Sequence, residues 1–445
     1  MVLKLVIVAV LCALTSLASH YGRAVFHDGI RPIMPEYNEG RMKRGEMASV
    51  AFGLSAGFIL SMGFAFTISS GLLNPWLLFL PTDILGIVAP YGWLAGVLGA
   101  VWGVGVTAFF DGLHSVLSIL PVNMLDALGA LSSPVIAGFA LFPALAVLSQ
   151  FGWQRGVATL LLELVARQLA ALNIITIGGT SISPEALEMF VGVILLVVFA
   201  IAKDSKRSKE EKAAAKGENI FTQNTLRIFK SLPLLMVIGG LVSLVSNMQW
   251  FAGSEVDFQL LHQVYASGTM AGLSNVAAAD FVRGLAFIPL IVTTSLASGV
   301  YGVVGLTFVY PVGYWLAPAL FGTGIFGHIM AFVLGAGTIL LEVSVLRLVG
   351  EGLGSFPSLR EASDNIRSAM NNVLEVALLI GSALAVLNMN VPNATGQNWL
   401  GFGLFVSMYM INEYLGRPLI RMAASPLAAI VTGILLNVFY LLHLL

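Results

Sequence analysis

The chain has very little charge and almost no cysteine. Asp, Glu, Lys and Arg together make up 10% of its 445 residues, and Cys12 is the single cysteine. One cysteine excludes an intrachain disulfide and any metal site built from several cysteines. The net charge is −1 and no basic, aromatic-rich patch occurs, so nothing predicts a nucleic-acid partner. The GxxxxGK[ST] pattern of ATP-binding loops is also missing, so the sequence gives no indication of ATP-driven activity.

Long apolar runs are abundant instead. Hydrophobic residues make up 58% of the chain, and the mean hydropathy is +0.91. Uncharged apolar runs of about 18 residues or more cross lipid as helices, because lipid offers the backbone no hydrogen-bond partner. The runs lie at 2–19, 49–71, 94–110, 135–148, 157–172, 190–202, 232–246, 285–299, 325–346, 373–387, 400–411 and 428–445. We therefore expect an all-α polytopic membrane protein with about 12–14 hydrophobic segments.

A charged stretch at 203–224, KDSKRSKEEKAAAKGENIFTQN, divides the chain near its midpoint. We interpret it as a linker between two transmembrane repeats, residues 1–202 and 225–445. The halves show several local similarities in the same order along the chain. The matching pairs are 121–148 with 360–387, Glu163-x-x-x-Arg167 with Glu413-x-x-x-Arg417, and Ser183-Pro184 with Ser425-Pro426.

The distribution of positive charge predicts how the halves are oriented. Cytoplasmic loops are enriched in Lys and Arg. Placing 20–46 and the linker in the cytoplasm puts 249–280, which has neither residue, on the outside. All 22 basic residues then lie inside except Lys4, Arg167 and Arg283. This arrangement needs an odd number of crossings in each half, so the repeats are expected to be inverted, with both termini outside.

Each half also contains a segment interrupted by proline and glycine. In the first half it is 72–90, with Pro81 and Gly86 flanking Asp83; in the second it is 302–318. Broken helices at membrane depth are tolerated where they line a cavity. Inverted repeats with broken helices are typical of secondary transporters, whose substrate site lies between the repeats. Half-helix N-termini favour an anionic substrate group.

Polar residues inside apolar segments are candidate site residues, because they are costly in lipid. Each also has a structural interpretation. Asp83, after Thr82, could cap a half-helix at 84–89, and Asn123 with Asp126 could cap the following helix. Ser132 and Ser133 could serve close helix packing. The full substrate-site prediction is Thr82, Asp83, Asn123, Asp126, Ser132, Ser133, Asn371, Asn372, Glu375, Asn412 and Arg417.

In the second half, Asn371, Asn372 and Glu375 extend into an apolar helix and could bind a polar ligand, a proton or Na⁺. Asp364 and Arg367 are expected to form a structural pair at the cytoplasmic edge. A helix break next to Asn412 and Arg417 favours a place for them at the site.

Other charged groups receive structural interpretations. His27, Asp28 and Arg31 form a polar cluster with too few ligands for a metal, so we expect a gate or an interface contact. Glu163 and Arg167 lie four residues apart and are expected to form an ion pair within one helix.

Four motifs resemble those of the YhfT-type family of bacterial inner-membrane transport proteins. They are HDGIRPIMP (27–35), LLFLPTDILG (77–86), SDNIRSAMN (363–371) and NEYLGRP (412–418), and the resemblance extends over nearly the whole chain. It implies a bacterial inner membrane and a transporter-like role, without a substrate. By analogy, paired broken segments resemble elevator-type transporters, which commonly dimerise. Ascorbate-type phosphotransferase components and seven-plus-seven nucleobase or anion carriers both remain compatible.

The sequence thus predicts a secondary transporter, elevator-like, for a small polar metabolite that can carry a carboxylate. A channel and a group-translocating sugar permease are the alternatives. An enzyme is not expected, because no nucleophile–base or metal constellation is apparent. We expect no cofactor beyond possible coupling to H⁺ or Na⁺, and partners limited to the substrate, the lipid bilayer and a second copy in a homodimer.

Overall fold

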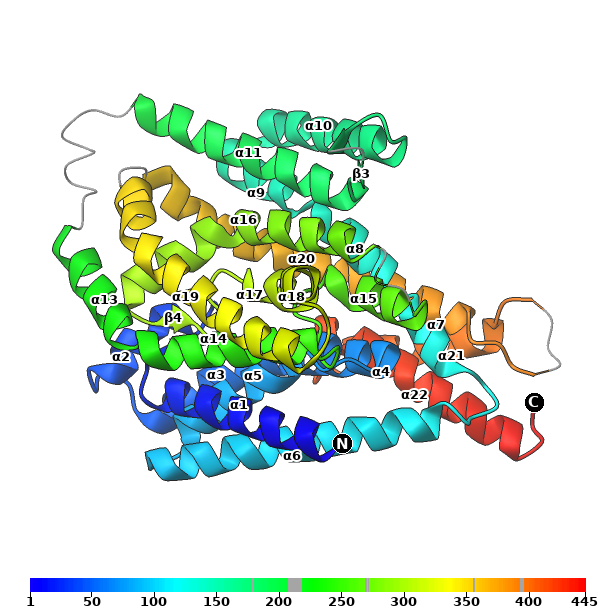
Figure 1. Cartoon of the computed structure of the whole chain (residues 1–445). Coiled ribbons are helices and arrows are strands. Elements are labelled where there is room, and N and C mark those ends of the chain that lie inside the picture. The colour runs from blue at the N-terminus through cyan, green and yellow to red at the C-terminus, as the bar shows by residue number, and fades with distance from the viewer. Residues whose placement is uncertain (178–179, 207–217, 269, 271, 355–356, 393–395) are drawn as a thin grey trace.

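The protein is almost entirely helical in a computed structural model (Figure 1). The structure describes residues 1–177, 180–206, 218–268, 270, 272–354, 357–392 and 396–445. Of the predicted linker 203–224, residues 207–217 therefore lie outside the described residues.

The elements up to the linker are α1 (Val2–His20), β1 (Ala24–Val25), η1 (Arg31–Ile33), α2 (Met34–Asn38), α3 (Arg44–Phe58), η2 (Ile59–Ala65), α4 (Phe66–Ser70), α5 (Pro75–Val88), α6 (Gly92–Leu117), α7 (Met124–Gly129), α8 (Ser132–Ala140), α9 (Phe142–Phe151), α10 (Trp153–Ala171), β2 (Thr176–Ile177), β3 (Thr180–Ser181) and α11 (Pro184–Ser205). Those after it are α13 (Glu218–Lys230), α14 (Leu232–Asn247), α15 (Asp257–Ala266), α16 (Leu273–Ser298), β4 (Tyr301–Gly302), α17 (Val309–Pro311), η3 (Val312–Leu316), α18 (Ala317–Phe321), α19 (Ile325–Gly354), α20 (Pro357–Leu387), α21 (Trp399–Tyr414) and α22 (Arg421–Leu441). The stretches η2 and η3 are π-helical.

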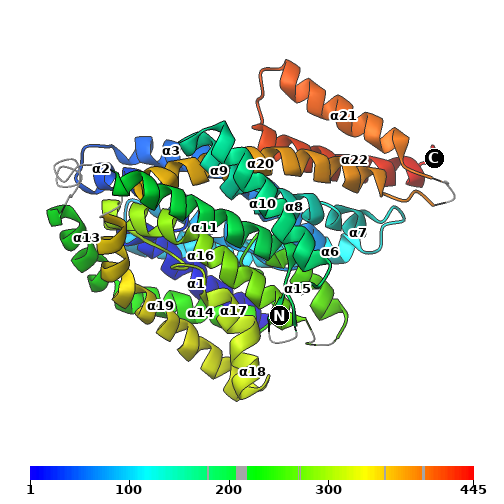
Figure 2. The same ribbon diagram turned by 90° about the horizontal axis from the view of Figure 1, so that it is seen from above.

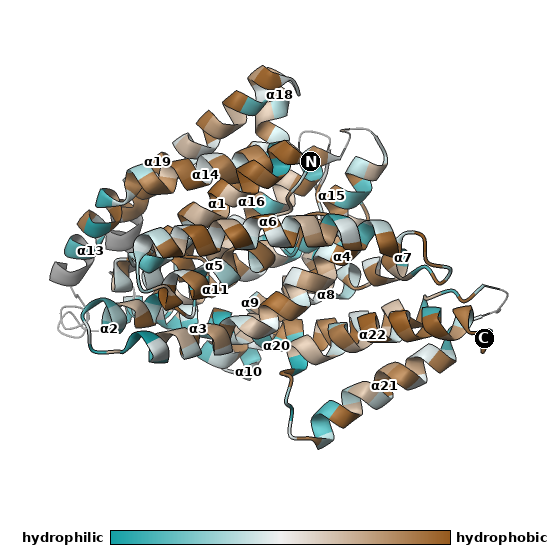
Figure 3. Ribbon diagram, turned by 90° about the horizontal axis from the view of Figure 1, so that it is seen from below, coloured by the Kyte–Doolittle hydropathy of each residue, from teal (hydrophilic) through white to brown (hydrophobic). Residues whose placement is uncertain are grey.

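The length and composition of these helices confirm a multi-pass membrane protein. Within the described residues, 9 helical stretches are long and apolar enough to cross a membrane, and α13 with α14 forms a further pair bent by 59°. The other apolar segments are shorter, broken or more polar: α5 has 14 residues, α21 has 16, and α10 carries Arg155, Glu163 and Arg167. Figure 3 shows hydrophobic residues along α14, α19 and α22, and hydrophilic residues gathered in α2 and α13.

Two long helix pairs lie next to each other in the molecule. The helices α1 and α6 pack along one another, as do α14 and α19, and α1 also contacts α14. On the opposite side, α10 and α11 pack against α9, while α21 and α22 extend from one end together with α20 (Figures 1 and 2).

Short extended segments join the two halves of the chain. We call residues 21–30, between α1 and η1, the first connecting loop, and residues 248–256, between α14 and α15, the second connecting loop. Strand β1 of the first loop pairs in parallel with β4, and Tyr301 N donates to Arg23 O at 3.2 Å. In the second loop, Trp250 O accepts from Leu73 N at 2.9 Å.

The same close contact occurs twice. A Cβ atom on Gly86 of α5 would overlap the carbonyl oxygen of Ser16 in α1, so only glycine fits there. Gly313 of η3 makes the same approach to Ser243 O in α14. The residue that ends each long helix then bonds the glycine carbonyl: His20 Nδ1 lies 3.1 Å from Gly86 O, and Asn247 Nδ2 donates to Gly313 O at 2.9 Å.

The expected break at Pro81 is wrong, because α5 continues through it. Proline lacks the N–H that would bond the carbonyl four residues earlier. That carbonyl belongs to Leu77, and it accepts a hydrogen bond from Trp102 Nε1 of α6 at 3.0 Å instead. The helix is capped at Asn74, whose side chain accepts from Leu77 N at 2.9 Å, so Asp83 is not a cap either. The second predicted segment is broken, into α17, η3 and α18.

Candidate functional site

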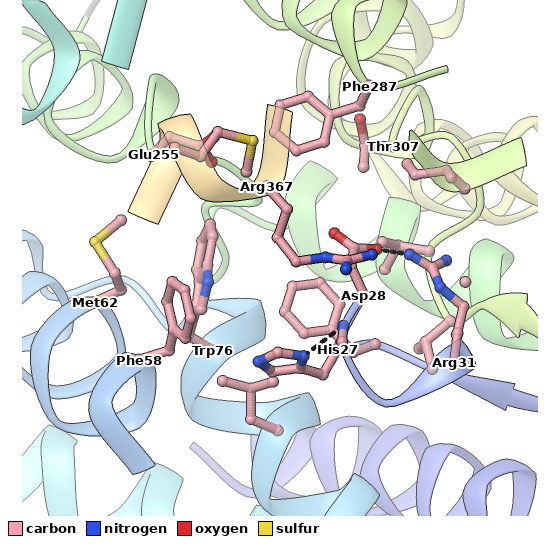
Figure 4. A pocket seen from close by; sticks show the side chains of 18 of the residues that line it. His27, Asp28, Arg31, Phe58, Met62, Trp76, Glu255, Phe287, Thr307 and Arg367 are labelled. Atoms are coloured by element: carbon pink, nitrogen blue, oxygen red, sulfur yellow. Dashed lines mark hydrogen bonds and ion pairs between the residues drawn. The ribbon is translucent and has the colours of Figure 1, made fainter. Parts of the chain in front are cut away.

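A cavity of about 160 Å³ lies between segments from both halves of the chain. In the first half of the chain, its wall comes from the first connecting loop, η1, α3, η2, α5 and α8. In the second half, it comes from α16, α20, the end of β4 with the residues after it (302–305 and 307), and Glu255 of the second connecting loop. Figure 4 shows Arg367 of α20 reaching towards Asp28 and Arg31, with Phe58 and Trp76 on the near wall and Phe287 and Thr307 across from them.

Three arginines line the cavity, and only two carboxylates do. Arg31, which is 1% exposed, forms an ion pair with Asp28. Arg283 Nη2 donates to Glu255 at 2.7 Å, and its Nη1 donates to Thr307 Oγ1 at 3.2 Å. The third arginine, Arg367, leaves the cavity with an excess positive charge.

Arg367 uses little of its hydrogen-bonding capacity. Its Nη1 donates to Asp364 at 3.2 Å, on the exposed side of α20. Its Nε and Nη2 are buried and have no hydrogen-bond partner among the described residues. A buried, unpaired donor on a charged group is costly, so an arginine kept in this state is suited to an anion that supplies two oxygens.

His27 is held as a neutral imidazole. Gly29 N donates to its Nδ1 at 2.9 Å, so the proton sits on Nε2, which faces Leu54 O at 3.1 Å. Burial lowers the pKa of His27 to about 4, and the charges of Arg31 and Arg367 act in the same direction, although the bond to Leu54 opposes them. The positive charge of the cavity at neutral pH therefore comes from arginine alone.

A buried aspartate fixes the backbone of each connecting loop. Asp83 Oδ2 accepts from Phe26 N at 2.9 Å and from His27 N at 3.0 Å. Asp257, the first residue of α15, accepts from Gly253 N at 2.9 Å and from Ser254 N at 3.0 Å. In both loops the next residue is the acidic one that lines the cavity, Asp28 or Glu255. Each aspartate thus positions a carboxylate that holds a cavity arginine.

Apolar side chains complete the wall at helical spacing. Leu54 and Phe58 of α3 and Met62 of η2 line the cavity. On α16, Phe287 and Ile291 follow Arg283 at intervals of four residues. Trp76 of α5 lies beside Phe58 in the view of Figure 4. The cavity therefore combines an apolar surface with arginine donors.

The predicted site residues do not gather at one place. Asn371 lines the cavity, and Asp83 supports it from behind, with Oδ1 lacking a partner among the described residues. Thr82 Oγ1 lies 2.9 Å from Thr15 Oγ1 at the contact of α5 with α1. Asn123 caps α7 and donates to Asp126, at the surface. Ser132 is buried in the first turn of α8, and Ser133 after it is exposed.

The remaining predicted residues lie near α21 and α22. Asn372 is exposed on α20, and Glu375 pairs with Arg421 at 3.2 Å. Asn412 bonds both backbone groups of Leu419, which closes the turn between α21 and α22. Arg417 pairs with Glu413 at 2.9 Å on the surface, as the spacing of the two residues predicts.

The Glu163–Arg167 pair is wrong. Arg167 bonds Glu185 of α11 at 2.9 Å and lies 3.5 Å from Glu188, because α11 packs along α10. The carboxylate of Glu163 is buried and has no hydrogen-bond partner in the described structure.

The sequence analysis noticed the charged cavity residues but did not predict that they lie together at one site. Arg31 and Asp28 were expected at a gate or interface, and Arg367 in a structural pair with Asp364. Arg283 carried the clearest signal, because it breaks the charge asymmetry of the loops. The three basic residues that break this asymmetry each bond a carboxylate: Lys4 bonds Asp111 at 2.7 Å, Arg167 bonds Glu185, and Arg283 bonds Glu255.

Comparison with known proteins places the chain in a family. A family model named YhfT, described as a protein of unknown function, matches residues 4–445. An uncharacterized protein YhfT of Escherichia coli (strain K12) is 44% identical over 447 residues, which cover 99% of this chain and 98% of that protein. No solved structure matches the chain. The chain therefore belongs to the YhfT family, as its four motifs suggested.

Proposed function

We propose that the protein is a secondary transporter of a small organic anion and works by alternating access. In this proposal the cavity is the substrate site, and the residues before and after the linker form two inverted repeats. The inner membrane, the cytoplasmic linker, the elevator-type movement and the homodimer belong to the same proposal.

Matching contacts in the two halves support the repeats. Ser16, His20 and Gly86 make the contacts that Ser243, Asn247 and Gly313 make, and each second number exceeds its counterpart by the same amount. Arg23 and Trp250 differ by the same amount, and each accepts a backbone bond from the other half of the chain, from Tyr301 and Leu73 respectively. Packing of α1 along α6 and of α14 along α19 agrees with this correspondence.

The cavity wall follows the same correspondence. Asp28 and Glu255 are equivalent, since each follows two N–H groups held by a buried aspartate. Leu54, Phe58 and Met62 recur at every fourth residue, as the cavity residues 283, 287 and 291 on α16 do, although their numbers do not differ by that same amount. A site with equivalent parts of both repeats around it is where secondary transporters bind their substrates.

The unpaired guanidinium edge of Arg367 is the observation that supports an anionic substrate. Arginine binds a carboxylate through two parallel N–H bonds, and Nε with Nη2 is a suitable edge for this. Arg31 and Arg283 are already neutralised by Asp28 and Glu255. The aromatic wall of Phe58, Trp76 and Phe287 favours a carboxylate attached to an apolar or aromatic body.

Thermal unfolding of the purified protein with benzoate tests this proposal. Benzoate joins one carboxylate to an aromatic ring, and benzyl alcohol is the uncharged control. Binding to the folded state stabilises it by RT ln(1 + [L]/Kd), about 2.7 kcal/mol at 100 Kd, so the unfolding temperature should rise with benzoate concentration.

The matched variants are Arg367→Gln in the cavity and Arg41→Gln in the exposed cluster with Glu36. We expect Arg367→Gln to lose most of the shift and Arg41→Gln to keep it. Equal shifts in both variants, or an equal response to benzyl alcohol, would remove Arg367 from the proposed site.

A further inference from the structure

A second group of buried acids lies next to the cavity, behind Arg283. Asp257 and Asp280 are both buried, at 0% and 3% exposed, and Ser254 donates to both carboxyl groups, through its backbone N–H to Asp257 and through its hydroxyl to Asp280. Two ionised carboxylates held by one buried serine repel each other, and this repulsion favours protonation of one of them. This arrangement therefore favours one proton held by the two groups together.

The other partners of this pair are uncharged donors. Gly253 N and Ser254 N donate to Asp257, Ser254 Oγ donates to Asp280 Oδ1, and Tyr314 OH donates to Asp280 Oδ2 at 3.0 Å. Among the described residues, neither carboxyl forms an ion pair with a basic side chain. A buried pair without a cation in ion-pair contact depends on a bound proton to limit its charge.

A buried tyrosine hydroxyl near the same two carboxyl groups also lacks a hydrogen-bond partner in the described part of the chain. Tyr310 of α17 is 1% exposed, and its hydroxyl has no hydrogen-bond partner among the described residues. It lies within electrostatic range of Asp257 and Asp280. The titratable groups around the pair are Tyr265 of α15, Arg283 of α16, Tyr310, Tyr314 of η3 and Glu255 of the second connecting loop.

We propose that Asp257 and Asp280 bind a single proton between them, and that this proton is coupled to anion binding in the cavity. The inference rests on the proposed function, because it needs a substrate in that cavity. Burial and the neighbouring charge of Asp280 raise the pKa of Asp257 well above its usual range, which agrees with a retained proton.

Arg283 connects the pair to the cavity. It lies three residues after Asp280 on α16, feels the charge of that carboxyl, and bonds Glu255 in the cavity wall. Loss of the proton turns the pair from one negative charge into two. The added charge offsets more of the positive field of Arg283, so an anion in the cavity binds less tightly. Proton and anion therefore bind together, which is the linkage that a proton symporter needs.

The equivalent position in the first half lacks this second carboxyl. Asp83 holds the first connecting loop as Asp257 holds the second, and its remaining oxygen, Oδ1, has no partner within the described chain. Among the described residues, the acidic pair thus lies beside the second connecting loop and Arg283, and not beside the first loop.

The first experiment measures the affinity for benzoate between about pH 6 and about pH 9, where the ligand stays ionised. The wild-type affinity should weaken as pH rises, by up to about tenfold per pH unit for one linked proton. Asp280→Asn imitates the protonated acid, because its amide can donate to Asp257. It should still bind benzoate, with little dependence on pH.

Two further variants make the result decisive. Asp364→Asn removes an exposed carboxyl of α20 and should keep the wild-type pH dependence. Tyr314→Phe removes a donor to Asp280, so the pH midpoint should move upward while binding persists. An unchanged pH dependence in both Asp280→Asn and Tyr314→Phe would overturn the coupling.

Infrared difference spectroscopy tests the pair without any ligand. Protonated carboxyl groups have a C=O stretch that carboxylates lack, and a part of this band should disappear in Asp280→Asn at neutral pH. A band identical to that of the wild-type protein would refute the shared proton. If benzoate binds at no pH but the band changes, the cavity assignment fails while the proton site stands.

Discussion

At the scale of single residues, the cavity depends on charged side chains whose partners differ. Arg31 and Arg283 each have a carboxylate partner, whereas the buried edge of Arg367 has none among the described residues. A neutral imidazole at His27 completes this arrangement, since its two nitrogens already bond Gly29 N and Leu54 O. A proton added to Nδ1 would face the N–H of Gly29, so the loop resists protonation.

The stability of the protein should therefore fall in mild acid through His27. Its pKa is about 4 in the folded protein and about 6.5 in an unfolded chain, so the unfolded state binds more protons between these values. The stabilisation is complete above about pH 6.5 and is lost as pH falls towards 4, by ~3 kcal/mol at most. Thermal unfolding from pH 7 downward should show a smaller loss for His27→Gln than for the wild-type protein. Parallel curves would contradict the prediction.

At the scale of elements, α5 shows how a helix can keep a proline in its interior. Pro81 leaves Leu77 O without its usual partner, and Trp102 of the neighbouring α6 donates to that oxygen. The helix therefore depends on a contact from another element, and its N-terminal turn is fixed separately by the cap at Asn74.

A double-mutant cycle tests this contact. Trp102→Phe should destabilise the protein, because Leu77 O becomes an unpaired buried acceptor, at a cost of about 1–3 kcal/mol. Pro81→Ala restores the helical N–H, so the same Trp102→Phe change should cost less in that background. Chemical denaturation of the four proteins measures the coupling energy. Strict additivity would show that Trp102 acts only through packing.

The glycine contacts of α5 and η3 give a second prediction at this scale. Gly86→Ala and Gly313→Ala each place a methyl group against a backbone carbonyl of a neighbouring helix, and both should cost about 1–3 kcal/mol. Gly105→Ala in α6 is the control, since nothing lies within 4 Å of its added Cβ. The control should be neutral or stabilising by up to about 1 kcal/mol. A loss in the control equal to that of Gly86→Ala would remove the steric explanation.

At the scale of the whole molecule, alternating access requires helices on different sides of the cavity to move relative to one another. The contact between α16 and α20 crosses the cavity region, and there Thr293 Oγ1 lies 2.5 Å from Ser363 Oγ. Two side chains this close are suited to a disulfide after replacement by cysteine.

Thr293→Cys with Ser363→Cys, in a Cys12→Ala background, should lock this contact. Exchange of labelled benzoate across proteoliposomes should stop on oxidation and return on reduction, while benzoate binding in detergent persists. Each single-cysteine variant is the control. Full exchange by the oxidised double variant would show that α16 and α20 do not separate during transport.

Much of the architecture could be predicted from sequence, and the site could not. Apolar length identified most of the membrane helices. The proline and glycine pattern predicted a break at Pro81, but there Trp102 of another helix bonds the carbonyl that the proline leaves free. Polarity within apolar segments identified Asp83 and Asn371 near the cavity, and it also selected Asn412 and Arg417, which form local contacts at the turn after α21. A polar residue in an apolar segment can lie at the cavity or form a local structural contact, and only its bonding partners show which of the two it does.

The sequence by itself determined that this protein is a helical, multi-pass membrane protein, because a helix in lipid must be apolar along its own length. It also determined family membership, through motifs spread over the chain. The tertiary structure alone decided which arginines meet in one cavity and which of them lacks a partner. Arg31, Arg283 and Arg367 lie far apart in the chain, and whether a charge is neutralised depends on which carboxylate packing brings within reach.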